Sequence, residues 1–140
     1  MLLVVFTHSL ISMYEAAFAE MRLDFPVNVM TFYDFMKSNE SYDYILADEV
    51  QDLTPSVLQK MKDRARHVVV AGDSNQSIYD KDPKFEEETV SPSRINELLS
   101  SSEFELGIIH RLSSSIINAL QKFLPSLNIF SAKRDLTKET

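Results

Sequence analysis

Two adjacent carboxylic acids, Asp48 and Glu49, directly follow a short apolar run at residues 44–47. The run predicts a buried β-strand, so both acids are expected at its carboxyl end, where open parallel α/β sheets bind ligands. One carboxylate at such an edge can hold Mg²⁺, a hard cation that takes oxygen ligands and nucleotide phosphates. The other can orient and deprotonate an attacking water. The pair therefore favours nucleotide hydrolysis.

The same acids also have a purely structural interpretation. Acids after a strand often serve as helix N-caps or solvated loop residues, and Asp52 precedes Leu-Thr-Pro, which is typical of a helix start. Because short motifs often match by chance, Asp48 and Glu49 alone support both interpretations about equally.

A second apolar run, at residues 68–71, ends in Gly72-Asp73 and a polar loop that carries Gln76. A side-chain amide can donate to a phosphate oxygen and accept from a water, so it can report whether the third phosphate is present. The two polar loops are one strand–helix–strand unit apart. They are therefore expected side by side in a parallel sheet.

The segments at 48–52 and 72–79 resemble motifs II and III of superfamily 1 DNA helicases of the UvrD/Rep/PcrA type. Each motif alone is moderately specific, whereas the pair in this order and spacing is highly specific. The resemblance implies an α/β fold, namely a partial RecA-like domain of the P-loop NTPase type. Its sheet would be mostly parallel and flanked by helices.

The resemblance also implies a role for each matching residue. Asp48 would ligate Mg²⁺, Glu49 would position and activate the water that attacks ATP, and Gln76 would sense the γ-phosphate. The residues that would couple the nucleotide state to the DNA side are Gln51, Asp52 and Asp73.

Three further segments match the same family in order, although each match is individually weak. Residues 3–8 resemble motif Ia and residues 29–32 the neighbouring Thr-Phe motif, both on the DNA side. Residues 110–113 resemble motif IV, whose arginine, Arg111 here, would bind the phosphates and stabilise transferred charge. The resemblance covers residues 2–124. The candidate contacts to single-stranded DNA are Thr7, His8, Thr31, Phe32 and Tyr79.

Several of these residues have simpler alternatives. Thr7 and His8 could end a strand and begin a helix. Phe32 belongs to an aromatic cluster after a strand, and such clusters usually pack inward. Arg111 could be a surface or ion-paired arginine, but its position before a Ser-rich helix start favours the phosphate role.

Two departures from the family pattern suggest a divergent branch. Family members follow the Gln-Ser-Ile-Tyr sequence with Gly-Trp-Arg-Gly, whereas Tyr79 is followed here by Asp-Lys-Asp-Pro and the chain has no Trp. Motif IV has a Tyr before its Arg, where this chain has His110. The contacts of this chain with nucleic acid are therefore expected to differ from those of typical family members.

The sequence has no Walker A motif. A P-loop needs glycines because its backbone must wrap a phosphate, and neither Gly72 nor Gly107 precedes Lys-Ser or Lys-Thr. Later motifs of the second motor domain are also absent. The chain is expected to be a fragment, and its partners would be the missing P-loop segment and second motor domain of the same polypeptide.

Length and composition suit one soluble domain. The 140 residues are 44% hydrophobic and 25% charged, and they include no Cys. We expect one domain over residues 1–130 and a polar tail, or the start of a linker to the second motor domain, over residues 131–140. No apolar stretch is long enough to span a bilayer and no signal peptide is evident, so no membrane is expected and a cytoplasmic location is predicted.

The net charge of −7 opposes strong nucleic-acid binding by this chain alone, because phosphate contacts need Lys and Arg. A basic cluster of Lys60, Lys62, Arg64 and Arg66 lies on and just beyond the helix predicted after motif II. Its position favours a solvated helix C-terminus over a DNA-binding surface.

The hydrophobic periodicity predicts alternating strands and helices, the pattern of a doubly wound parallel sheet. Strands are expected at 2–6, 27–31, 44–47, 68–71 and 104–109, and helices at 10–21, 32–37, 55–64, 94–99 and 113–124.

These features lead to two interpretations. The first is a fragment of a DNA helicase that, when intact, couples hydrolysis of ATP with Mg²⁺ to translocation on single-stranded DNA and duplex unwinding; the isolated chain would be inactive. The second is a degenerate RecA-like module that hydrolyses nothing and serves as a binding or scaffold domain.

Overall fold

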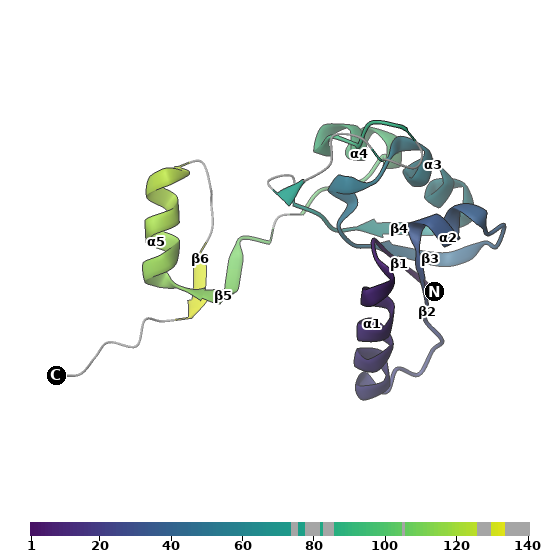
Figure 1. Ribbon diagram of the computed structural model, residues 1–140, viewed down its shortest axis with the longest axis horizontal. Coiled ribbons are helices and arrows are strands. Elements are labelled where there is room, and N and C mark those ends of the chain that lie inside the picture. The colour runs from purple at the N-terminus through teal and green to yellow at the C-terminus, as the bar shows by residue number, and fades with distance from the viewer. Residues whose placement is uncertain (74–75, 78–81, 83–85, 105, 126–129, 134–140) are drawn as a thin grey trace. The chain divides into compact units, whose positions relative to one another are not determined.

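A computed structural model of the chain describes residues 1–73, 76–77, 82, 86–104, 106–125 and 130–133 (Figure 1). The chain divides into two compact units, Met1–Ser102 and Glu103–Thr140. The domain predicted over residues 1–130 therefore includes the first unit and most of the second.

In the described part of the first unit, four strands form one sheet, in the order β2-β1-β3-β4, and all neighbouring strands are parallel. The strands are β1 (Leu2–Val5), β2 (Asn28–Thr31), β3 (Tyr42–Ala47) and β4 (Ala65–Val70). Val4 is in register with Ala47, which in turn is in register with Val70. The carboxyl ends of β1, β3 and β4 are therefore level, and the predicted parallel α/β fold is confirmed.

Helices cover this sheet on both faces (Figure 1). Helix α1 (His8–Met21) lies on one face; α2 (Phe32–Lys37), α3 (Pro55–Arg64) and α4 (Pro92–Leu99) lie on the other. The bounds of α2 and α3 are those predicted from the sequence. Helix α1 begins earlier than predicted because Thr7, in an extended conformation, occupies its N-cap position.

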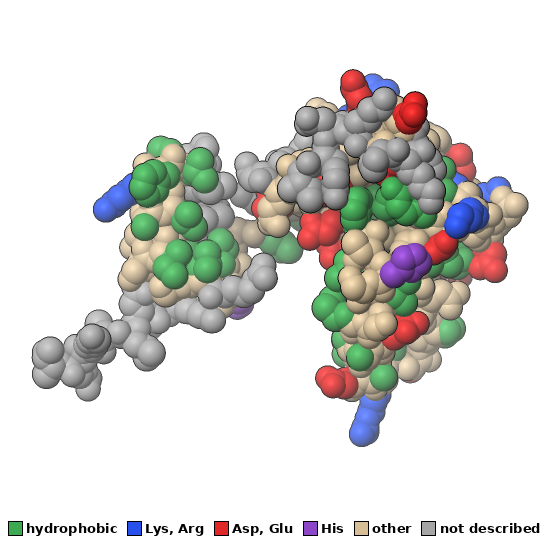
Figure 2. Space-filling view, in the orientation of Figure 1, with side chains coloured by type: hydrophobic (Ala, Val, Ile, Leu, Met, Phe, Trp, Pro, Cys, Tyr) green, Lys and Arg blue, Asp and Glu red, His purple; other side chains and the backbone are tan. Residues whose placement is uncertain are grey.

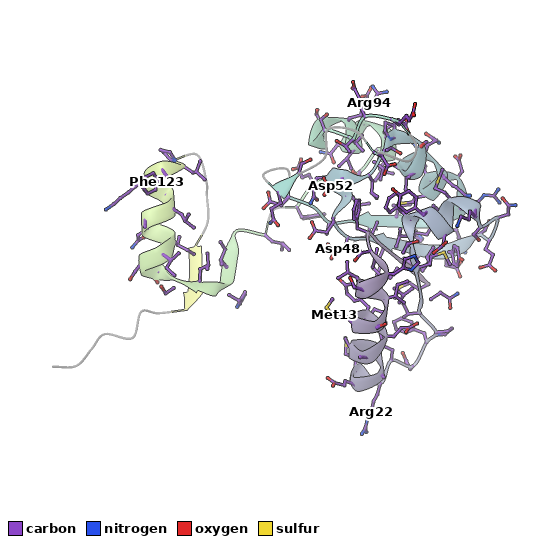
Figure 3. All side chains as sticks on the ribbon, viewed as in Figure 1. Met13, Arg22, Asp48, Asp52, Arg94 and Phe123 are labelled. Atoms are coloured by element: carbon purple, nitrogen blue, oxygen red, sulfur yellow. The ribbon has the colours of Figure 1, made fainter. Side chains whose placement is uncertain are left out.

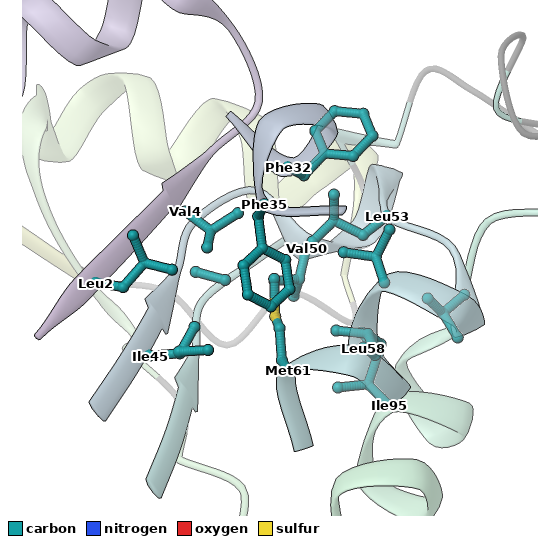
Figure 4. Close-up of a cluster of buried hydrophobic side chains, with 13 residues drawn as sticks. Leu2, Val4, Phe32, Phe35, Ile45, Val50, Leu53, Leu58, Met61 and Ile95 are labelled. Carbon is teal, nitrogen blue, oxygen red and sulfur yellow. The ribbon is translucent and has the colours of Figure 1, made fainter. Parts of the chain in front are cut away.

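The hydrophobic core fills the space between the sheet and helices α2, α3 and α4 (Figure 4). Alternate strand residues point to the same face, so Leu2 and Val4 of β1 meet Ile45 of β3 on the core side. The rings and long side chains that pack on them include Phe35 and Met61, both fully buried. Complete burial of each such side chain contributes about 1.5–3 kcal/mol.

The face of β3 and β4 that points away from the core carries exposed apolar side chains. Tyr44 is 47% exposed and Val69 is 55% exposed. An open depression on this face is lined by apolar residues of β1, β3 and β4 and by Asp48. Purely parallel sheets are normally covered on both faces, so this surface is unusual for a parallel sheet.

The second unit contains β5 (Ile108–Ser113), α5 (Ser114–Phe123) and β6 (Phe130–Lys133), and β5 pairs with β6 in parallel. Strand β5 is displaced toward the C-terminus relative to the predicted strand at 104–109. Strand β6 was not predicted, because four residues carry too little periodicity, and it includes residues 131–133 of the expected tail. Hydrophobic side chains gather on the surface of α5, where Phe123 is 83% exposed (Figure 2).

Candidate nucleotide and nucleic-acid site

The polar loops that follow β3 and β4 meet at the carboxyl edge of the sheet. The amide of Val50 donates to the carbonyl of Ala71 (3.1 Å), and the amide of Asp48 donates to the carbonyl of Val4 (3.3 Å). These bonds tie the loop after β3 to both neighbouring strands. Asp48, labelled in Figure 3, lies next to α1, from which the hydroxyl of Tyr14 contacts it.

Both carboxylate oxygens of Asp48 accept hydrogen bonds. Oδ1 accepts from the amide of Glu49 (3.0 Å), and Oδ2 accepts from the hydroxyl of Tyr14 on α1 (2.8 Å). The hydrogen bond to Asp48, followed by burial, raises the pKa of Tyr14 above its ordinary value. Sequence reasoning missed Tyr14, because one Tyr in an amphipathic helix pattern gives no signal of a polar contact.

The backbone of Glu49 is in the left-handed region, with φ 57° and ψ 42°. Few residues other than Gly adopt this conformation, and such strained positions cluster at functional sites. The turn directs the chain from β3 into a short 3₁₀ helix, η1 (Val50–Asp52). Oε2 of Glu49 accepts a hydrogen bond from Nε2 of Gln51 at 2.6 Å, which fixes the carboxylate.

The side chain of Gln51 joins the two polar loops. It is 5% exposed, and its two ends have different partners. Nε2 donates to Glu49, while Oε1 accepts from the backbone amide of Asp73 at 3.1 Å. One buried amide therefore connects the Glu49 carboxylate to the loop after β4.

The loop after β4 makes further contacts of the same kind. Gln76 is exposed, its Nε2 donates to Oδ2 of Asp73 (2.9 Å), and its backbone amide donates to the Asp73 carbonyl (2.9 Å). The hydroxyl of Ser77 donates to Oδ1 of the buried Asp52 at 3.3 Å. The sheet edge thus brings together six of the residues predicted from motifs II and III, namely Asp48, Glu49, Gln51, Asp52, Asp73 and Gln76.

The predicted DNA contacts fall into two groups. Thr7 and His8 are exposed at the start of α1. Thr31 is buried, and its hydroxyl caps α2 by accepting from the amide of Asp34 (3.2 Å) and donating to its carboxylate (2.7 Å). Phe32 is fully buried and stacks on Phe6 with ring centroids 5.1 Å apart. Side chains without exposed surface cannot contact a nucleic acid, so the expected DNA contacts by Thr31 and Phe32 are corrected to a capping role and a packing role.

Two predicted site residues cannot be related to this edge. Tyr79 lies outside the described residues. Arg111 lies in β5 of the second unit, where the prediction had it follow a strand. Their roles at the nucleotide or the DNA remain predictions.

Three residues of the basic cluster after motif II donate hydrogen bonds to backbone carbonyls near the C-terminal ends of α2 and α4. Lys60 donates to the carbonyl of Met36 (2.7 Å), and Lys62 donates to that of Leu98 (2.8 Å). Arg64 likewise donates to the carbonyl of Asn39 at 2.8 Å. These contacts agree with the structural role favoured by the sequence.

The surroundings of Asp48 suit Mg²⁺ better than a metal ion that is coordinated entirely by protein side chains. Among the described residues no group of three or more His, Cys, Asp or Glu side chains could hold a metal ion. Mg²⁺ usually keeps several waters and binds through one or two carboxylates and substrate phosphates. A half-buried aspartate with both oxygens held in place fits that requirement.

The parallel sheet, its flanking helices and the acids at its carboxyl edge define a partial RecA-like α/β domain. Residues 13–80 match the UvrD/REP helicase N-terminal domain, which is a superfamily 1 helicase domain. The resemblance suggested by motifs II and III is thereby confirmed.

One curated relative is the F-box DNA helicase protein 1 of Schizosaccharomyces pombe (strain 972 / ATCC 24843), with 35% identity over 72 residues. The match covers 51% of this chain and 8% of the relative, so the chain spans a small part of that protein's length. No solved structure matches the chain significantly. Among the described residues, no helix combines the length and apolar character needed to cross a membrane.

Proposed function

We propose that this chain is part of the first motor domain of an ATP-dependent DNA helicase. In the intact protein, hydrolysis of ATP with Mg²⁺ would drive translocation on single-stranded DNA and duplex unwinding. The observation that carries this proposal is the buried Gln51 amide, which joins Glu49 of motif II to Asp73 of motif III. A coupling element of this kind suits a motor, because in a motor the state of the bound nucleotide must change the conformation at a second site.

Each acid at the sheet edge has a separate role in this proposal. Bound Mg²⁺ neutralises phosphate charge during phosphoryl transfer, and Asp48 would hold it. Glu49 would orient the attacking water and take its proton. Its left-handed backbone and its bond from Gln51 support this role, because both fix the carboxylate before substrate binds.

The remaining residues would sense the phosphate and transmit its state. Gln76 is exposed, and its side chain donates to Asp73. In this position its amide could donate to a phosphate oxygen. Arg111 would stabilise charge on the transferred phosphoryl group. Asp52 would join Gln51 and Asp73 in coupling, which its hydrogen bond from Ser77 of the motif III loop supports.

DNA contacts would come from the exposed Thr7 and His8, with Thr31 holding the next helix start and Tyr79 adding an aromatic ring. The relative in fission yeast is named a DNA helicase, which supports DNA as the nucleic acid. A P-loop segment of the same polypeptide would cover the apolar face of β3 and β4 beside Asp48. A second motor domain would complete the enzyme, and a cytoplasmic location remains part of the proposal.

The decisive experiment uses the full-length protein. Glu49→Gln is expected to abolish ATP turnover while leaving ATP binding nearly intact, because the amide keeps the size but loses the base. Asp48→Asn is expected to weaken both Mg²⁺-dependent binding and turnover. Gln76→Ala is expected to retain some hydrolysis that no longer responds to DNA.

A suitable control is Glu20→Gln, which neutralises an exposed acid near the C-terminal end of α1. It is expected to leave turnover unchanged. Near-normal turnover of Glu49→Gln would refute the proposed hydrolytic mechanism. Absence of turnover in the unaltered full-length protein would instead favour the non-hydrolysing scaffold.

A further inference from the structure

The hydroxyl of Tyr14 connects helix α1 to the acid that follows β3. It donates to Oδ2 of Asp48 at 2.8 Å in a partly buried environment. The Tyr14 ring is supported by Phe18, one turn further along α1, with ring centroids 5.9 Å apart. The contact therefore joins two elements that are 34 residues apart in sequence.

This hydrogen bond leaves Asp48 able to bind a cation. Each carboxylate oxygen has two lone pairs, and the contacts from Glu49 and Tyr14 use one on each oxygen. Groups that bond a ligating side chain without touching the metal orient it, and their loss commonly costs about 10–100-fold in metal affinity.

Tyr14 also lies on the helix that begins at the exposed residues Thr7 and His8. Tyr14 is six positions after His8, which corresponds to about 9 Å along a helix axis. Because a short helix moves as a stiff rod, a shift at its first turn would move the Tyr14 hydroxyl relative to Asp48.

We propose that Tyr14 is a positioning residue that orients Asp48 for Mg²⁺ and links this carboxylate to the amino-terminal end of α1. The inference rests on the proposed metal role of Asp48. In this role Tyr14 would act through Asp48 and would touch neither the metal nor the nucleotide.

The test is a titration of the 140-residue chain with Mg²⁺. Binding is measured from the NMR chemical shifts of the Asp48 and Glu49 amides. Tyr14→Phe, which removes only the hydroxyl, is expected to raise the half-saturating Mg²⁺ concentration about tenfold. In the Asp48→Asn background the same change is expected to have no further effect. Circular dichroism confirms that each variant is folded.

Tyr42→Phe is the matched control. The Tyr42 hydroxyl also donates to a carboxylate, that of Glu40, at 2.7 Å, but on an exposed surface. This variant is expected to bind Mg²⁺ like the unaltered chain. A shift as large as that of Tyr14→Phe would overturn the inference, because it would reflect a general loss of structure.

The remaining outcomes separate the inference from the proposed function. If Asp48→Asn weakens Mg²⁺ binding and a folded Tyr14→Phe does not, Tyr14 has no positioning role and the metal role of Asp48 stands. If neither variant changes the titration, or the unaltered chain shows no shift at Asp48, the positioning role of Tyr14 and the metal role of Asp48 are both wrong. In the full-length protein, Tyr14→Phe is expected to raise the Mg²⁺ requirement of ATP hydrolysis about tenfold while preserving kcat at saturating Mg²⁺.

Discussion

Oε1 of Gln51 lies 2.6 Å from the position that a Cβ atom would occupy on Gly72. The same oxygen accepts the hydrogen bond from the amide of Asp73 at 3.1 Å. The missing side chain at position 72 therefore lets the buried amide reach the loop after β4. This is a requirement for close approach, because the φ angle of Gly72 is not positive.

Gly72→Ala is expected to break the contact between Gln51 and Asp73. The added methyl would also lie 3.1 Å from Cγ2 of Val50, so the amide has to move. We expect the free energy of unfolding in urea to fall by about 1 kcal/mol, the typical contribution of one hydrogen bond. In a Gln51→Ala background the same substitution should cost much less, and equal costs in both backgrounds would contradict the assigned contact.

Glu49→Gly is expected to be more stable than Glu49→Ala. Both variants lose the carboxylate and its bond from Gln51, so their difference isolates the backbone at φ 57°. The left-handed conformation costs a residue with a Cβ about 1–2 kcal/mol, and Gly avoids most of that cost. Chemical denaturation of the two variants measures the difference.

Gln59 provides the control for this pair, because it is exposed within the regular helix α3. At position 59 the Gly variant should be less stable than the Ala variant by about 1 kcal/mol. The same sign at both positions would mean that Glu49 is not held in the left-handed region in solution.

Thr31→Val is expected to raise the pKa of Asp34. The Thr31 hydroxyl, and after it the Lys37 ammonium, hold the pKa of this carboxyl below its ordinary value. Without the hydroxyl, an NMR titration should show the Asp34 pKa closer to the ordinary value of an aspartate. Loss of the α2 cap should also destabilise the chain by about 1 kcal/mol.

The sign of the pH dependence follows from the lowered pKa. Asp34 contributes stability above its unfolded-state pKa, and this contribution is lost as the pH falls through the folded-state pKa. The acid sensitivity of unfolding should therefore be smaller in Thr31→Val. Thr54→Val, at the buried N-cap of α3, should leave the Asp34 titration unchanged.

Lys60→Met is expected to lower stability without changing affinity for nucleic acid. Lys60 donates to the Met36 carbonyl and lies 5.5 Å from the ring centroid of Phe35. Fluorescence anisotropy with a labelled oligothymidine should show weak binding by the unaltered chain, because its net charge is −7. A logarithmic salt slope of about −2 or shallower is expected for few phosphate contacts.

His8→Ala, at the exposed start of α1, is the comparison for Lys60→Met and should weaken this binding further. A steep salt slope, or a loss of affinity in Lys60→Met, would identify the basic cluster as a DNA surface. The structural role of these side chains would then be secondary.

The parallel sheet and the position of the two acids could be predicted from the sequence because both depend on local patterns. Apolar runs marked β3 and β4, and the alternation of strands with helices required parallel crossovers. Asp48 and Glu49 follow β3 directly in the chain, so their position at the sheet edge followed as soon as the strand was assigned. The spacing of the two motifs supplied the family.

Contacts between elements were decided by the tertiary structure. Whether Tyr14 reaches Asp48 depends on how α1 is rotated about its axis, and that rotation is set by packing on the sheet. Phe32 is in the core rather than on the DNA side because the ring of Phe6 and the α2 turn enclose it. The left-handed backbone of Glu49 and the close approach of Gln51 to Gly72 likewise arise only when two loops, distant in sequence, share one edge of the sheet.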